Sequence, residues 1–320
     1  MAITLTEAAK LSTTDLQKGV LETFVQTSPV LDRIPMLEIE GNAYAYNSEA
    51  TLPGVEFRAV NGSYSESTGT VNQKSETLAI LGGDADVDRF IQQTRSNLND
   101  QRATQTAMKV KAISYKFQDT FINGDSSTDA NSFDGLKKRL TGNQVIDADT
   151  NGLPVVGSSN ADIHTFLDKL DELLAAVPGI NGTNGAIYAN AKIIRKIASA
   201  LRHVGLDTVL MEDITGKRAI QWNGIPILDL GTTAAAAPVD ILPLTETQGT
   251  SHASSSIYAV KFGADEGDQA VTGLTNGGVQ VEDLGQLQSK PAYRTRIEFY
   301  CGMAVFGGKA AARLKGVLNG

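Results

Sequence analysis

The stretch RSNLNDQRATQTAMKVKAISYKFQDTFI, residues 95–122, contains neither proline nor glycine. Small and apolar side chains recur along it at spacings of three and four, which predicts one long amphipathic helix. The apolar face is formed by Ala103, Ala107, Val110, Ser114, Phe117 and Phe121, with Met108, Ala112 and Tyr115 widening it. A later start, capped by Asn99 or Asp100, is the alternative, and Asn123-Gly124 ends the helix. A rod of roughly 40 Å with a narrow apolar stripe predicts a spine laid across a sheet.

Length and composition describe a chain that can bury a large core. The 320 residues are 41% hydrophobic and 20% charged, enough for one large domain or two moderate ones. The formal net charge of -8 argues against nucleic-acid binding as the main purpose, because phosphate contacts need clustered lysine and arginine. Cys301 is the single cysteine, which excludes an internal disulfide and a cysteine metal cage.

The sequence gives no sign of a membrane or an export route. No apolar stretch approaches the roughly 20 residues that a membrane span requires. The first residues lack the basic start and apolar run of a secretory signal. We therefore expect synthesis in the cytosol and no membrane partner.

The first 92 residues do not look complete by themselves. Thr14 to Gln17 forms a plausible capping box for a short amphipathic helix, and an extended segment interrupted by Pro29 and Pro35 follows. Its apolar side chains need a surface elsewhere to cover them, so an arm over residues 1–48 is the simplest interpretation.

Residues 49–92 predict a long two-stranded excursion. Val55 and Phe57 alternate with charged residues, a polar tip rich in turn residues follows, and the chain returns towards Gly82-Gly83. A lone ribbon is marginal in water. We expect it to lie on another surface.

The region from about 160 to 290 has the pattern of an α/β unit. Apolar residues at helical spacing predict a helix that Asn160 caps and Pro178-Gly179 stops, and a second helix that Asn190 caps. Asn223-Gly224 between two short apolar runs predicts a hairpin. Alternation in the tail from residue 279 predicts long strands beside the spine helix.

Each motif that could carry chemistry has the wrong residue at a position that the chemistry requires. Asp84, Asp86 and Asp88 begin a calcium-loop pattern, but arginine stands at the sixth and twelfth positions, so a solvated strand edge is favoured. Gly307-Gly308-Lys309 lacks the first glycine and the Ser/Thr of a phosphate loop.

The remaining reactive side chains are scattered. The three histidines are His164, His203 and His252, and they form no H-x-x-x-H pair. Cys301 lies in an apolar strand, where packing is the default role. Lys137-Lys138-Arg139 is interpreted as a solvated basic patch. We predict no catalytic residue, no cofactor and no metal site, and hence not an enzyme.

The order of these parts resembles the major capsid proteins of tailed bacteriophages, which have the Hong Kong 97-type fold. Six stretches carry the resemblance, at both ends and in the middle of the chain. They are LTEAAKLSTTDLQKGVLETFVQTSPVLDRIP (5–35), YNSEATLPGVEFRAVN (46–61), VNQKSETLAILGGDADVDRFI (71–91), NDQRATQTAMKVKAISYKFQDTFINGD (99–125), FDGLKKRL (133–140) and YRTRIEFYCGMAVFGGKAAARLKG (293–316).

The resemblance implies an α+β fold of five parts. These are an N-terminal arm (1–48), an extended E-loop hairpin (49–92), a P-domain with the spine helix (93–156), an A-domain (157–277), and returning P-domain strands with the C-terminus (278–320). The region from about 145 to 290 is placed by position rather than by motif.

The same resemblance implies a structural subunit that assembles with itself as pentamers and hexamers into the icosahedral head around double-stranded DNA. We expect Val55, Phe57, Leu78, Ile80 and Leu81 to contact the neighbouring subunit, with Phe133, Asp134, Gly135 and Leu136 as further candidate contacts. The chain opens directly on the arm, so a separately encoded scaffolding protein is the expected partner, beside a portal and a decoration protein. Packaged DNA would be held without sequence-specific binding, and the location is the virion capsid, assembled in the host bacterial cytoplasm.

Two alternatives stay open. An encapsulin-like nanocompartment uses the same shell to hold protein cargo. From another class, the 160–290 region could be the catalytic domain of an oligomeric α/β enzyme, with the remainder as an oligomerisation frame.

Overall fold

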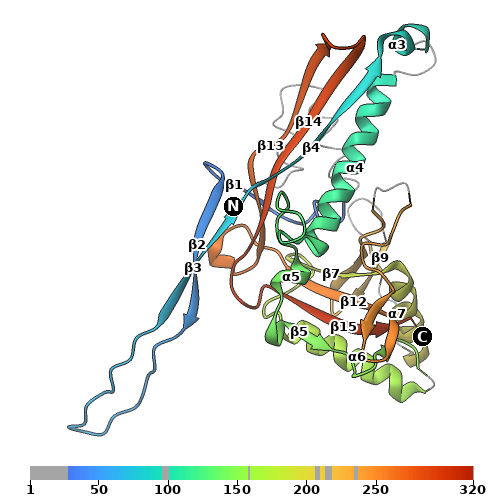
Figure 1. Cartoon of the computed structure of the whole chain (residues 1–320). Helices are drawn as coiled ribbons and strands as arrows, with labels where there is room; N and C mark the ends of the chain where they lie inside the picture. Colours follow the sequence, from blue (N-terminus) through green and yellow to red (C-terminus); the bar gives the residue numbers. More distant parts are fainter. Residues whose placement is uncertain are drawn as a thin grey trace.

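The computed structural model describes residues 28–95, 101–157, 159–205, 210–212, 218–233 and 237–319. Within them the chain folds as two large sheets, a long helix and a projecting two-stranded ribbon (Figure 1). The predicted α+β class is therefore confirmed. The predicted capping box at Thr14 to Gln17 lies outside the described residues.

The first sheet has four strands in the order β1-β13-β14-β4. Its strands are β1 (Met36–Glu38), β13 (Val271–Gln286), β14 (Ala292–Val305) and β4 (Ala79–Asp88). Strand β1 runs parallel to β13, and the other pairs are antiparallel. The long strands predicted in the tail are β13 and β14, and the sheet joins them to β1 and β4 from the N-terminal third of the chain.

Helix α4 (Gln101–Asn123) runs along this sheet as the predicted spine (Figure 1). Its buried face consists of Thr106, Val110, Ile113, Ser114, Phe117, Gln118, Thr120, Phe121 and Ile122. The rings of Phe117 and Phe299 of β14 lie 5.8 Å apart, centroid to centroid. In the described residues no helix is both long and apolar enough to cross a bilayer.

The predicted apolar face of α4 is wrong in its first turns. Ala103, Ala107 and Met108 are exposed, whereas Thr106 and Ile113 are buried. Alanine offers little apolar area, so the larger side chains further along set which face meets the sheet. Helix α3 (Arg89–Arg95) comes earlier in the chain, and α4 begins at Gln101; the alternative caps Asn99 and Asp100 lie outside the described residues.

The second sheet has nine strands, in the order β5-β15-β12-β7-β10-β9-β8, with β11 on β12 and β6 on β15. Its strands are β5 (Val145–Asp147), β6 (Leu153–Pro154), β7 (Gly185–Ala189), β8 (Leu210–Glu212), β9 (Arg218–Trp222), β10 (Ile225–Asp229), β11 (Glu246–Gln248), β12 (Ser251–Lys261) and β15 (Ala311–Leu318). The predicted hairpin is β9-β10, and Asn223 and Gly224 both have positive φ at its turn.

The central strand β7 connects the two cores of the molecule. Ile187 and Ala189 face one cluster, with the helices α6 (Asn160–Ala175) and α7 (Ala191–Val204). Tyr188, on the opposite face, joins the cluster that contains the end of α4. Asn190 caps α7 as predicted, but the cap of α6 is Ser159, one residue before the predicted Asn160.

Residues 28–39 correct the interpretation of the arm. Val30, Leu31 and Ile34 are fully buried in the core of this same chain, beside α4. Arg33 donates to the carbonyl oxygens of Gly182 and Gly185, at 3.2 Å each. This part of the predicted arm is therefore covered by its own subunit.

The ribbon consists of β2 (Ala43–Thr51) and β3 (Thr70–Thr77), which pair antiparallel. It starts earlier than the predicted excursion and ends earlier too, because residues from Ala79 onward pair with β14. The remaining short elements are α5 (Leu136–Arg139), η1 (Gly142–Gln144) and η2 (Glu266–Asp268).

Candidate assembly interface

The ribbon projects from the body without cover. All side chains from Leu52 to Ser75 are exposed. Figure 1 shows the blue hairpin leaving the body at β2 and β3 and ending in a long irregular loop. A two-stranded ribbon with no surface beneath it gains little from burial. Its length is therefore unexplained by the folding of one subunit.

The loop of the ribbon presents apolar side chains directly to solvent. Val55, Phe57 and Val60 have exposed fractions of 95%, 107% and 91%. Contacts within the loop organise it: the amide of Gly62 donates to the carbonyl of Ala59 at 3.0 Å, and the guanidinium of Arg58 lies 5.3 Å from the ring centroid of Tyr64. We call residues 52–69 the ribbon tip. A preformed apolar tip of this kind is typical of a surface that another protein covers.

The other candidate contacts after the ribbon differ among themselves. Ile80 is 72% exposed on β4, where it lies opposite Tyr300. Leu78 and Leu81 are half-buried and pack against clusters of their own subunit. Of these three, Ile80 has the side chain that is free to meet a neighbour.

The structure gives the segment 133–136 a role inside the subunit. Phe133 and Leu136 are buried in the main core, and Phe133 packs against Phe117. A Cβ on Gly135 would lie 2.6 Å from the carbonyl oxygens of Thr120 and Ile122. Phe133, Gly135 and Leu136 thus hold this loop against the end of α4 within the chain.

Asp134 is half-buried and also serves this loop. Its Oδ1 accepts hydrogen bonds from the amide of Ser126 at 2.8 Å and from Nζ of Lys138 at 2.9 Å. Burial opposes ionisation of this carboxyl, but the bonds from Ser126 and Lys138 outweigh it and lower its pKa. These hydrogen bonds hold the segment 133–136 in place within the chain.

The base of the ribbon stands on a small separate core, which we call the ribbon root: Tyr44, Tyr46, Glu76, Arg139 and Phe306. The rings of Tyr46 and Phe306 meet edge to face with centroids 4.9 Å apart. Tyr44 lies 6.1 Å from the same ring and donates its hydroxyl to Glu266 at 2.7 Å. This hydrogen bond raises the pKa of Tyr44 to about 12.

An ion pair closes the other side of the ribbon root. Arg139 of α5 holds the carboxylate of Glu76 of β3 through both terminal nitrogens, with Nη2 at 2.6 Å from Oε2. Both side chains are about 15% exposed. Burial disfavours the charge on Arg139, but the Glu76 carboxylate outweighs it and raises the pKa of the guanidinium.

Tyr46 links the ion pair to the sheet. Its hydroxyl lies 3.4 Å from Oε1 of Glu76 and 3.2 Å from the carbonyl oxygen of Val305. Burial, followed by the charge of Glu76, raises the pKa of Tyr46 to about 12, so the hydroxyl stays protonated near neutral pH. Sequence reasoning missed Tyr46, Glu76 and Arg139. The one available signal was the basic run 137–139, whose last member turns inward while Lys137 and Lys138 stay exposed.

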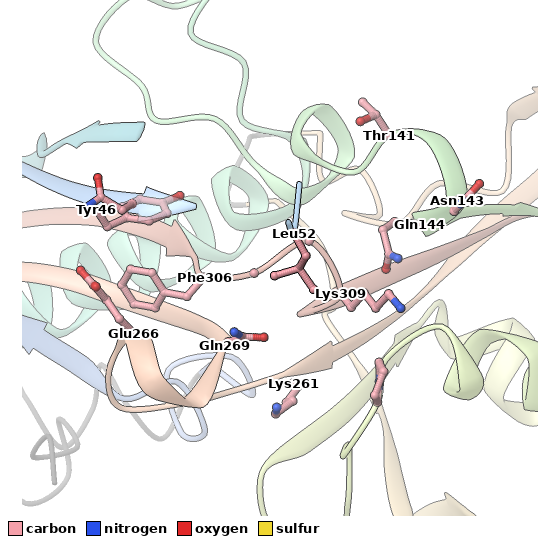
Figure 2. Close-up of a pocket in the computed structure, with 14 residues that line it drawn as sticks. Tyr46, Leu52, Thr141, Asn143, Gln144, Lys261, Glu266, Gln269, Phe306 and Lys309 are labelled. Atoms are coloured by element: carbon pink, nitrogen blue, oxygen red, sulfur yellow. The ribbon is translucent and has the colours of Figure 1, made fainter. Parts of the chain in front are cut away.

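A groove of about 750 Å³ lies beside the ribbon root (Figure 2). Lys261 and Lys309 reach it from the body, and Tyr46, Leu52 and Phe306 line it from the ribbon side. Its lining residues include no histidine, cysteine or aspartate. The Gly307-Gly308-Lys309 motif is part of this wall, in the turn between β14 and β15. These side chains supply no paired nucleophile and base.

The other motifs have structural partners. Asp84 and Asp86 accept hydrogen bonds from Arg296 and Arg294 across β4 and β14. His164, His203 and His252 are exposed on three different elements. Cys301 is buried in β14, and burial raises the pKa of its thiol. Among the described residues no group of three or more His, Cys, Asp or Glu side chains has the arrangement of a metal site.

One family model matches part of the chain. The family model described as major capsid protein GP7 matches residues 13–164. Comparison with curated proteins gives no match.

Solved structures match about nine-tenths of the chain in fold. The SrpI encapsulin of Synechococcus elongatus has a TM-score of 0.66 at 19% identity, covering 91% of this chain and 87% of its own. The capsid of a native GTA particle has 0.60 at 16% identity, covering 91% and 90%. Mycobacterium phage Bobi has 0.58 at 14% identity, covering 90% and 89%.

Proposed function

We infer from the Hong Kong 97-type fold, together with the match to major capsid protein GP7, that the chain is a major capsid protein, the structural subunit of a phage head. The observation that carries this function is the uncovered ribbon with Val55, Phe57 and Val60 almost fully exposed at its tip. A subunit that lays this apolar tip on its neighbour completes its burial only in the shell.

We propose that the ribbon tip and Ile80 supply the contacts between subunits. Head-to-tail contacts that close by rotation produce rings, here pentamers and hexamers. Obligate interfaces commonly bury roughly 2,000 to 5,000 Å². Every subunit both gives and receives such contacts, so the shell is held more tightly than any single pair.

The division into parts follows the same proposal. The ribbon of residues 43–77 corresponds to the E-loop, and β4 then belongs with α4, β13 and β14 in the P-domain. The nine-stranded sheet with α6 and α7 corresponds to the A-domain. Residues 28–38 belong with the P-domain in this proposal, because Val30, Leu31 and Ile34 lie in the core beside α4 and β1 pairs with β13.

Further partners are proposed on the resemblance alone. They are a separate scaffolding protein, a portal, a decoration protein, and packaged double-stranded DNA bound without sequence specificity. The net charge of -8 supports loose contact with DNA, because a shell subunit of this charge lacks the excess of cations that tight phosphate binding needs. We propose assembly in the host bacterial cytoplasm and no enzymatic activity of the subunit.

Electron microscopy of the purified recombinant chain, alone and with its candidate scaffolding protein, tests this function. Closed shells of uniform size with fivefold vertices are the expected result. A chain that stays monomeric or dimeric under every condition, by gel filtration and light scattering, contradicts it and favours the α/β enzyme alternative.

An encapsulin-like compartment is the second candidate, because the SrpI encapsulin shares the fold of this chain with a TM-score of 0.66. The content of particles isolated from the native source separates the two. Nuclease-protected DNA of genome length supports a phage head, and a protein cargo without DNA supports the compartment.

A further inference from the structure

The ribbon joins the body through a very small area compared with its length. From Glu76 at the ribbon root to Asn61 at its far end are 15 residues, which span roughly 50 Å when extended. A rotation of about 10° at the root would therefore move the tip by about 9 Å, several times the tolerance of a packed apolar contact. The direction of the ribbon must be fixed at its root.

Three polar contacts fix that direction from different sides. Tyr46 donates to the carbonyl of Val305 at the end of β14, and Tyr44 reaches Glu266 on the loop before β13. The third contact, Arg139 to Glu76, joins the ribbon to α5.

The Arg139–Glu76 pair differs from the other two contacts in its two-bond geometry and in the further hydrogen bond that holds Arg139. Its two parallel bonds define a plane and so restrain rotation, which a single hydroxyl contact does not. Arg139 is itself held, because its Nε donates to the carbonyl of Asp134 at 2.6 Å. Asp134 belongs to the loop after α4, in which Gly135 packs closely against the end of that helix. A rigid path therefore runs from the spine helix to the ribbon.

We propose that Arg139 and Glu76 are the positioning pair of the assembly reaction: they set the direction of the ribbon so that its tip meets the neighbouring subunit. The pair is not itself an inter-subunit contact, since both side chains are covered within one chain. This inference rests on the proposed function only for its consequence in assembly. The restraint on the ribbon is a property of the free subunit.

Glu76→Gln and Arg139→Lys are the test variants. Glu76→Gln keeps the shape of the side chain and removes its charge, and Arg139→Lys keeps the charge and removes the planar two-bond contact. Lys137→Gln is the matched control, because Lys137 lies on the same short helix and pairs with Glu246, which belongs neither to the ribbon nor to the loop that holds Arg139.

Hydrogen exchange of dilute, unassembled subunits is the primary measurement. We expect amide exchange in β2 and β3 to rise by about tenfold in both test variants, while β7 and β12 keep the rates of the unchanged protein. The control should change neither region. Equal ribbon exchange in the test variants and in the control would overturn the proposal, as would a rise spread equally over the whole molecule.

Assembly of the same proteins is the second measurement. The unchanged chain and Lys137→Gln are expected to form closed shells, whereas both test variants should form open or irregular particles. Normal shells from both test variants would overturn the positioning role. Failure of every protein to form shells, despite the ribbon-specific exchange effect, would instead count against the capsid function and leave the restraint intact.

Discussion

Phe133 packs its ring against Phe117 of α4, with the two centroids 5.9 Å apart, and Phe117 in turn contacts Phe299 of β14. This row of rings joins the loop after the spine helix to the centre of the four-stranded sheet. It explains why a segment that resembles a capsid motif is buried within one subunit.

Phe133→Ala should therefore lower the free energy of unfolding of the subunit by about 3–5 kcal/mol, the range for removing a buried aromatic ring. Denaturant unfolding of the unassembled chain measures this. If the variant keeps its full stability but no longer assembles, Phe133 is an inter-subunit contact and not a core residue.

Phe57→Ser should reduce assembly while it leaves the stability of the subunit nearly unchanged. The side chain is fully exposed, so the unfolding free energy should change by less than about 0.5 kcal/mol. Assembly should be strongly reduced, as seen by light scattering and electron microscopy. Val239→Ser is the matched control, since Val239 is 58% exposed on a loop far from the ribbon in sequence. Equal effects of the two substitutions would count against a specific tip contact.

Gly135→Ala should destabilise the subunit by about 1–3 kcal/mol, because the new methyl group would collide with backbone oxygens that cannot move aside. Gly308 offers a comparison: a Cβ there has no neighbour within 4 Å, and its φ is not in the left-handed region. Thermal unfolding of both alanine variants checks the difference. A stable Gly135→Ala protein would mean that the loop can shift away from α4.

The ion pairs between β4 and β14 should make the free energy of unfolding depend on pH in the acid range. The hydrogen bond from Arg296 lowers the pKa of Asp84, and those from Arg294 and Lys290 lower the pKa of Asp86. A carboxyl whose pKa is lower in the folded state stabilises the fold above its unfolded pKa, about 3.9. This stabilisation is lost as the pH falls from about 4 through the folded values.

Unfolding of the unchanged chain should accordingly weaken below about pH 4, and the Asp84→Asn/Asp86→Asn variant should show a shallower slope there. Parallel denaturant titrations between roughly pH 2 and pH 6 compare the two proteins. Identical slopes would show that other carboxyls control the acid response. The effect should be modest, because both side chains are partly exposed.

Cys301 should not react with iodoacetamide in the native protein. The thiol is about 1% exposed, and burial raises its pKa, so the thiolate that alkylation needs is scarce. Mass spectrometry after alkylation with and without denaturant provides the measurement. Rapid labelling of the folded subunit would indicate that β14 opens locally.

Local sequence patterns were sufficient to identify the main elements. The helix of α4, the cap of α7 by Asn190, and the Asn223-Gly224 hairpin all depend on neighbouring residues. The exposed tip was also predictable, because Val55 and Phe57 alternate with charged residues in a stretch too polar to form a core.

Long-range packing decided what those patterns could not. Val30, Leu31 and Ile34 look like an uncovered arm in sequence, yet residues some 80 to 270 positions away bury them, as the shared cluster with Phe117 and Cys301 shows. The same limitation applies to Phe133 and Leu136, whose burial depends on α4 and β14.

The sequence by itself determined an α+β chain with a spine helix and a ribbon that has no core of its own. Helix periodicity, turn residues and the alternation of apolar and charged residues are local properties. The tertiary structure decided which ends of the chain share a sheet and how the ribbon is held. Arg139 and Glu76 are 63 positions apart, and a charge in a basic run has the same local pattern whether it faces water or a buried carboxylate. Only the fold brings the two together.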